Sequence, residues 1–96
     1  MRAIRRAQRK VRLRLYIAGN APNSLQALAN VRTLLDQHLG SSHELEIVDL
    51  LKHPRRGLTD GIIVTPTLLR LLPLPVERLI GNLSDSQKVL LTLVGR

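Results

Sequence analysis

Few residues in this sequence could carry out acid–base, metal or thiol chemistry. The chain contains no cysteine, which excludes a thiolate nucleophile, a disulfide and a cysteine-bound metal. Its three histidines, His38, His43 and His53, lie without the spacing of a metal site, so we predict no metal. Asp49 and Asp60 have no paired carboxylate in the sequence, which favours surface roles over acid–base catalysis. We therefore predict a protein that is not an enzyme and has no cofactor.

One short segment is a candidate for a binding turn. An apolar stretch ends at Ile17, the turn Ala18–Ser24 follows, and a helix is predicted after it. The first N–H groups of a helix are free to attract an anion or a polar group of a partner. Alternatively, Asn20, Pro22 and Asn23 only build the turn and cap the helix. Both interpretations stay open.

The positive charge of the chain is concentrated at its start. The first fourteen residues carry seven basic side chains, and the remainder carries eight basic and seven acidic ones. We predict a flexible basic arm at residues 1–10 and a nearly neutral domain at residues 11–96. The arm favours nucleic-acid phosphates or acidic lipid as partners, but it has no aromatic residue for base stacking. The alternative is a solvated terminus without a partner.

Length and composition favour one small domain with an aliphatic core. The chain has 96 residues, and Tyr16 is its only aromatic residue. No apolar run approaches the ~20 residues of a membrane span, and the start lacks the apolar stretch of a secretory signal. We therefore predict a cytoplasmic protein that has no membrane partner.

The first half of the chain has the pattern of a strand, a helix and a second strand. Residues 11–17 alternate apolar and polar side chains, as in a strand with one buried face. Asn23 is predicted to cap the following helix with Gln26 in a capping box, and Gly40 to end it. Residues 43–51 form the second predicted strand. Such a βαβ unit is expected to join parallel strands.

The second half is less strongly patterned. Residues 52–61 are predicted as a short helix that begins at Pro54, although two glycines weaken it. The β-branched run 62–64 favours a strand, with Pro66 at an edge or bulge and a candidate cis Thr65–Pro66 bond. Residues 76–81 alternate as another strand. Ser84 and Gln87 are predicted to cap a last helix. The resulting order is that of a thioredoxin-like βαβαββα domain with a mixed four-stranded sheet, an α/β fold.

Several long phrases of the sequence resemble the KaiB family of circadian clock proteins. They are "LYIAGNAPNSLQAL", "VDLLKHP", "VTPTL" and "LPLPVERLIGNLSDSQKVL". The resemblance implies a regulatory protein with two folds, a tetrameric ground state and a monomeric, thioredoxin-like state. The thioredoxin-like state is implied to bind the KaiC-type ATPase ring, after which the complex captures KaiA.

The sequence also departs from the usual KaiB pattern. Gly61 stands where the family usually has lysine, and Thr92 and Val94 stand where it usually has glycine and aspartate. Glu44 and Glu46 replace residues that are often basic or small. Thr92 favours a helix more than glycine does, and Val94 adds apolar surface to a face that can pack. We therefore predict a divergent paralogue that rests as a thioredoxin-like monomer. Gly61, Thr92 and Val94 are the residues predicted to decide its fold; the tetrameric ground-state fold is the alternative.

The predicted partner-binding residues combine the turn with positions suggested by the resemblance. Lys52, Arg70 and Arg78 match basic positions of the family, whereas solvated surface is the default expectation for them. The TPT segment at residues 65–67 either recognises a partner or is a packing turn. The complete set is Asn20, Pro22, Asn23, Lys52, Pro54, Asp60, Gly61, Thr65, Pro66, Arg70 and Arg78. A nucleic-acid-binding protein, a KaiB paralogue without a clock role and a thioredoxin-like enzyme of a non-redox kind are the competing hypotheses.

Overall fold

The computed structural model describes residues 10–94 and shows seven elements in the predicted order. The arm predicted for residues 1–10 lies outside the described residues except for Lys10. The elements are β1 (Val11–Ile17), α2 (Pro22–His38), β2 (His43–Asp49), α3 (Pro54–Asp60), β3 (Thr67–Leu72), β4 (Glu77–Ile80) and α4 (Ser86–Val94). The predicted fold class, a thioredoxin-like α/β domain with a mixed four-stranded sheet, is confirmed.

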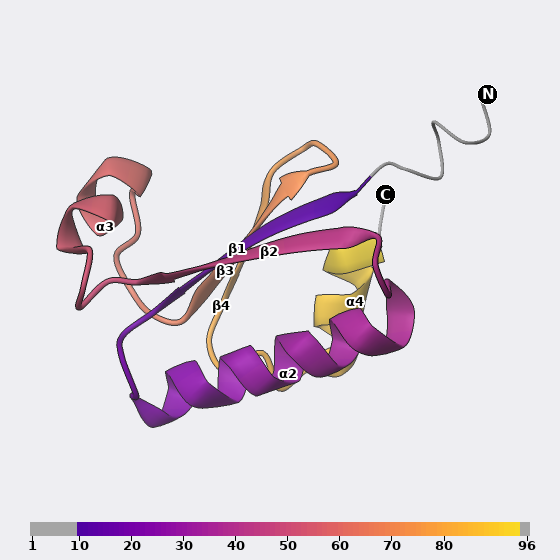
Figure 1. Ribbon diagram of the computed structural model, residues 1–96, viewed down its shortest axis with the longest axis horizontal. Coiled ribbons are helices and arrows are strands. Elements are labelled where there is room, and N and C mark those ends of the chain that lie inside the picture. Colours follow the sequence, from indigo (N-terminus) through magenta and orange to yellow (C-terminus); the bar gives the residue numbers. More distant parts are fainter. Residues whose placement is uncertain (1–9, 95–96) are drawn as a thin grey trace.

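The four strands form one sheet in the order β2-β1-β3-β4. Strands β1 and β2 are parallel, as predicted for a βαβ unit, whereas β3 is antiparallel to both β1 and β4. Helices α2 and α4 lie on one side of the sheet, and α3 lies on the other side near one end (Figure 1). The loop between β3 and β4 lies at the opposite end (Figure 1).

The larger core lies between the sheet and the two helices α2 and α4. Alternate residues of β1, namely Leu13, Leu15 and Ile17, point to this side and are buried. They pack in one cluster with Val31 of α2 and Leu93 of α4, among others. Because period-two alternation places every second residue on the same face, the aliphatic half of β1 was predictable.

A smaller core lies on the opposite face of the sheet. Tyr16, Val48, Ile62 and Leu69 form a separate buried cluster, and Tyr16 has no solvent exposure. The prediction that β1 buries only one face is therefore wrong at this position. The pattern places Tyr16 on the polar face, but α3 and the segment that follows it cover that part of the sheet.

Two predicted helix caps are wrong. Helix α2 begins at Pro22 after Ala21, and no side chain caps it, so Asn23 lies inside the first turn. In α4, the Asp85 carboxylate accepts a hydrogen bond from the Lys88 N–H at 3.1 Å, in the role predicted for Ser84. Asp, Asn and Ser are all good caps, and spacing alone does not choose between neighbours. The end of α2 is as predicted: Gly40 has φ +52° and donates to the Leu35 carbonyl.

The segment before β3 is not a strand. Residues 62 and 63 have no regular structure, residues 64–66 form bends, and the strand begins only at Thr67. A loop follows here because Pro66 cannot donate a ladder hydrogen bond, and Thr67 Oγ1 donates to the Val64 carbonyl at 2.7 Å. The predicted cis Thr65–Pro66 bond is confirmed, and Leu72–Pro73 and Leu74–Pro75 are also cis.

Candidate partner-binding surface

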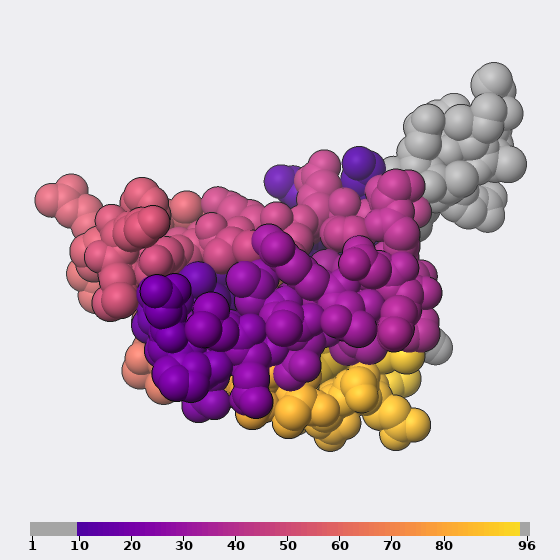
Figure 2. All heavy atoms as spheres, turned by 60° about the horizontal axis from the view of Figure 1, so that its bottom comes forward, coloured from indigo at the N-terminus to yellow at the C-terminus, as the bar shows by residue number. Residues whose placement is uncertain are grey.

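Two stretches that are distant in sequence, residues 18–24 and residues 50–66, meet at one end of the sheet, which we call the loop end. It comprises residues 18–24, residues 50–53, α3 and residues 61–66. Parallel pairing brings the ends of β1 and β2 together, and the Leu50 N–H donates to the Ile17 carbonyl at 2.9 Å. Pairing of Tyr16 with Thr67 places the start of β3 at the same end. The start of α2 and α3 lie at this same end of the molecule, on opposite sides of the sheet (Figure 1 and Figure 2).

The turn between β1 and α2 is built by hydrogen bonds to its own backbone. The Ala18 N–H donates to the Ser24 hydroxyl at 3.0 Å, and the Ala21 N–H donates to the Ala18 carbonyl at 3.1 Å. Gly19 has φ +55°, and a Cβ at this position would lie 2.8 Å from a Leu51 methyl group. The turn therefore favours glycine for its conformation, whereas the exposed Leu51 side chain could move away from a Cβ.

Asp49 joins the two loops that follow β1 and β2. One oxygen of its carboxylate accepts hydrogen bonds from the backbone N–H groups of Gly19 at 2.9 Å and Leu51 at 3.0 Å. These two backbone hydrogen bonds lower the pKa of Asp49. This carboxylate therefore fixes the two loops relative to each other.

Asp60 attaches the end of α3 to the sheet. The Tyr16 hydroxyl donates to the Asp60 carboxylate at 2.6 Å, and the guanidinium groups of Arg14 and Arg56 lie 3.7 and 3.5 Å from the same oxygen. The hydrogen bond from Tyr16 lowers the pKa of Asp60, whereas burial raises the pKa of Tyr16. This carboxylate is held ionised among donors and serves as an anchor for the helix.

The loop end also exposes large apolar side chains that the sequence analysis did not single out. The exposed fractions are 71% for Leu51, 87% for Leu58, 91% for Ile63 and 44% for Val64. Single exposed apolar residues are common on protein surfaces, but several at one end of a small domain are typical of a contact surface. The β-branched run at residues 62–64 could have indicated these exposed apolar residues, but its strand propensity led to the prediction of a strand.

Basic side chains surround these apolar residues. Within residues 10–94, neither Lys52 nor Arg55 takes part in an ion pair, and both are exposed. Arg78 of β4 is also exposed, and its guanidinium donates to the Gly61 carbonyl at 3.4 Å. The acidic residues nearby, Asp49 and Asp60, are already engaged by hydrogen bonds. The loop end therefore combines exposed apolar groups with free positive charge.

The structure places the predicted binding residues together, with one exception. Asn20, Pro22, Asn23, Lys52, Pro54 and Gly61 are exposed at the loop end, and Thr65 and Pro66 lie at the start of β3. Asp60 and Arg78 connect to them through the contacts above. Arg70 is the exception, because it is only 2% exposed and lies near the far end of β3, opposite Glu77. The default expectation of solvated surface is wrong for Arg70.

The residues predicted to decide the fold have unequal surroundings. Gly61 ends α3 with φ +71°, a conformation that a lysine would adopt only with strain. Thr92 lies inside α4, and its hydroxyl donates to the Lys88 carbonyl at 3.1 Å. Val94 is 52% exposed, so the expectation that it packs is wrong. Leu93 fills the buried position instead.

The described part of the chain contains neither a candidate metal site nor a candidate membrane-spanning helix. Residues 10–94 contain no group of three histidine, aspartate or glutamate side chains close enough to hold a metal ion. None of the helices in that range is long and apolar enough to cross a membrane.

Comparison with known proteins identifies the family. The KaiB domain model matches residues 14–94. The circadian clock oscillator protein KaiB of Gloeothece citriformis is 47% identical over 81 residues, which cover 84% of this chain and 76% of that protein. Circadian clock protein KaiB3 of Synechocystis sp. is 45% identical over 84 residues, 88% of this chain and 82% of that protein.

Solved structures show the fold. The N-terminal domain of SasA from Synechococcus elongatus has a TM-score of 0.73 at 21% identity, covering 92% of this chain and 87% of that one. Chloroplastic thioredoxin z also has a TM-score of 0.73, at 14% identity, covering 92% of this chain and 79% of that one. These likenesses establish a thioredoxin-like fold, and the sequence matches establish the family. The chain therefore belongs to the KaiB family.

Proposed function

We propose that this chain is a non-enzymatic regulatory protein of circadian timing that binds a KaiC-type ATPase ring in its thioredoxin-like state. One observation carries the proposal: a chain of the KaiB family has its C-terminal half in the thioredoxin-like arrangement that ends in helix α4. The absence of cysteine from the sequence removes the thiolate on which the chemistry of thioredoxins depends. What remains of that fold is a binding surface.

The loop end is the surface that we propose for the ring. Its exposed apolar residues, Leu51, Leu58 and Ile63, would supply the buried centre of an interface. The free charges of Lys52 and Arg55 would form a positive rim, which favours a partner with acidic residues around an apolar patch. Binding would influence the ring only if the affinity differs between the states of the ring.

The proposal includes a preference between the two folds of the family. Thr92 lies within α4, where it costs roughly 0.3 kcal/mol less than a glycine would. Val94 avoids a negative charge at the C-terminal end of the helix, where an aspartate would be unfavourable. We therefore propose a monomer that is already in the thioredoxin-like state. The tetrameric ground state, a fold switch and recruitment of KaiA are the finer parts of the same proposal.

The deciding experiment is an NMR titration of isotope-labelled protein with KaiC and ATP. Backbone shifts of the free protein first assign residues 52–94, where we expect α3 and α4 to be helical. Adding KaiC with ATP should then broaden the signals of the loop end. Strand shifts at residues 87–93 would refute the proposed resting state, and an unchanged spectrum after addition of KaiC would refute the proposed partner.

A pair of variants locates the surface. Ile63→Asp places a charge on a side chain that is 91% exposed at the loop end, and Leu74→Asp does so on a side chain that is 71% exposed at the opposite end. If the loop end binds the ring, Ile63→Asp should weaken binding by at least about 30-fold, which is the loss typical of an interface hot spot. Leu74→Asp should leave the affinity unchanged. Equal effects of the two variants would contradict this location.

A further inference from the structure

Arg70 is a charged side chain at a position where a neutral residue would be expected. It belongs to β3, where it pairs with Leu13 of β1 on one side and with Glu77 of β4 on the other. Its side chain points to the face of the sheet that α2 and α4 cover, and only 2% of the residue is exposed. A buried guanidinium is costly unless hydrogen bonds replace the water that it loses.

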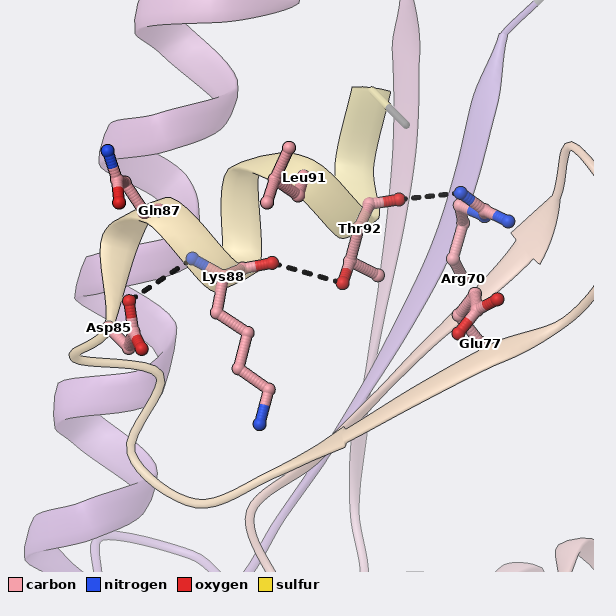
Figure 3. A pocket seen from close by; sticks show the side chains of 7 residues that line it. All are labelled: Arg70, Glu77, Asp85, Gln87, Lys88, Leu91 and Thr92. Carbon is pink, nitrogen blue, oxygen red and sulfur yellow. Dashed lines mark hydrogen bonds between the residues drawn. The ribbon is translucent and has the colours of Figure 1, made fainter. Parts of the chain in front are cut away.

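Two carbonyl oxygens replace that water, and they come from different parts of the chain. Nη1 donates to the Thr92 carbonyl of α4 at 2.7 Å, and Nη2 donates to the Pro75 carbonyl in the β3–β4 loop at 2.8 Å. Figure 3 shows the guanidinium of Arg70 reaching from its strand to the last turn of α4. One side chain therefore links three segments: β3, the β3–β4 loop and α4.

The Thr92 carbonyl needs such a donor for a reason of helix geometry. The last four carbonyl groups of a helix have no partner within it, and α4 ends at Val94. Carbonyls at this end also carry the negative pole of the helix dipole, so a cation there is favourable. The planar guanidinium can donate to two acceptors at once in a fixed geometry, which the ammonium of a lysine does less well.

The other end of α4 is held differently. The Asn82 carbonyl, shortly before α4, accepts a hydrogen bond from the Asn30 amide of α2 at 2.9 Å. The Asn82 amide in turn donates to Gln26 at 3.0 Å. These contacts tie the start of α4 to α2 and leave its end to Arg70 and to the packing of Leu93.

We propose that Arg70 is a clamp that docks the C-terminal end of α4 onto the sheet. With the clamp removed, the last turn of α4 detaches while its start stays tied to α2. The clamp concerns the free protein alone, so it stands or falls independently of any binding to KaiC.

Amide hydrogen exchange of the free full-length chain tests the clamp. In Arg70→Met, the hydrogen bonds of the guanidinium to the Thr92 and Pro75 carbonyls are lost, so the amides of residues 91–94 should exchange roughly 10- to 100-fold faster than in the wild type. Amides of residues 31–35 in α2 serve as the internal reference and should change much less. The exchange rates in Arg70→Lys should lie between those of the wild type and Arg70→Met, because lysine keeps the charge but lacks the planar guanidinium that donates to two carbonyls.

Arg78→Met is the matched control. It removes an exposed arginine from the neighbouring strand and should leave exchange in α4 unchanged. If Arg70→Met accelerated exchange equally in α2 and α4, or left α4 unchanged, the clamp would be refuted.

A measurement on the wild type covers the case in which Arg70→Met does not fold. The Nη protons of a guanidinium held by two carbonyls should give separate, slowly averaging NMR signals. Those of Arg78 should average rapidly. Rapid averaging at Arg70 as well would overturn the proposal.

Discussion

The two faces of the sheet are stabilised by different interactions, although β1 contributes to both. On the face that carries α2 and α4, Leu13, Leu15 and Ile17 join a continuous aliphatic core. On the other face, the same strand presents Arg12, Arg14 and Tyr16. Arg12 and Arg14 pair with acidic residues on β2, and only Tyr16 is fully covered. One face is therefore sealed by helices, and the other is sealed only where α3 crosses it.

This difference shows that coverage of the sheet by helices, more than residue type, decides how much a side chain contributes to the stability of the fold. Arg12, Arg14 and Tyr16 share one side of one strand, and the exposure of the residues falls toward the loop end. At the uncovered end, Arg12 and Glu44 form an ion pair 3.1 Å apart whose side chains are more than half exposed. At the covered end, Tyr16 is buried and its hydroxyl is bound to Asp60. Substitutions along this gradient of coverage should therefore differ in how much they destabilise the fold.

Shortening a side chain in the aliphatic core should have the largest effect. Leu15→Ala removes a fully buried side chain and should lower the free energy of unfolding by about 2–5 kcal/mol, since transfer and cavity terms add. Urea denaturation followed by circular dichroism measures this change. Leu25→Ala, at a leucine of α2 that is 50% exposed, is the control and should cost clearly less.

Removing one hydroxyl from the other face should have an intermediate effect. Tyr16→Phe keeps the ring but takes the donor from the Asp60 carboxylate, so the free energy of unfolding should fall by about 1–3 kcal/mol. Exchange of the amides of α3 should speed up more than exchange in α2. An α3 that is unaffected would mean that Asp60 does not anchor the helix.

The ionisable residues on the sheet face covered by α3 should make the stability of the fold depend on pH in both the acidic and the alkaline range. The pKa of Asp60 and that of Glu46 lie below their ordinary values of 3.8 and 4.5, because of hydrogen bonds from Tyr16 and Arg14 respectively. Their stabilisation is therefore complete above these ordinary values and is lost as the pH falls through the lower pKa of the folded state. The pKa of Tyr16 is raised above 10.0 by burial, so its stabilisation is present below pH 10.0 and disappears as the pH rises through the higher value.

Thermal unfolding across these ranges measures both effects. In Tyr16→Phe the loss on the alkaline side should disappear. An unchanged alkaline loss would contradict the assignment to Tyr16.

The exposed ion pair should contribute least. Removing the charge with Arg12→Gln should change the free energy of unfolding by no more than about 0.5 kcal/mol, because solvent screens the pair. A double-mutant cycle with Glu44→Gln isolates the interaction energy. A coupling as large as the effect of Tyr16→Phe would contradict the gradient between the covered and uncovered ends.

The sequence predicted the order of the elements, the fold class and the family, but several local details were wrong. Periodicity was sufficient to predict that β1 is a strand and α2 a helix, although it did not predict that Tyr16 is buried or that Leu25 is half exposed. It was insufficient at residues 62–64, where β-branched side chains favour a strand but Pro66 and the turn before β3 prevent one. The cap of α4 was misplaced by one residue because Asp85 satisfies nearly the same spacing rule as Ser84, whereas α2 begins at Pro22 without any side-chain cap.

The candidate site was predictable only in part, for a similar reason. Its polar members followed from the turn and from the resemblance to KaiB. Its exposed apolar members, Leu51, Leu58 and Ile63, were missed because a sequence pattern does not distinguish an apolar residue in the core from one on a contact surface. Arg70 was predicted as a partner contact because it matches a basic position of the KaiB family, and as solvated surface by default because an arginine is usually exposed; neither consideration shows that α4 covers it.

The amino-acid sequence was enough to establish which residues alternate, where the chain must turn, that these 96 residues include no cysteine, and the family to which the chain belongs. Those properties depend on residues close together in the chain or on whole phrases of sequence. Tertiary structure alone decided that Tyr16 is buried, that Asp49 and Asp60 hold loops and a helix in place, and that Arg70 joins β3 to α4. The physical reason is that burial and hydrogen-bond partners depend on segments far apart in sequence, which meet only when the sheet has formed.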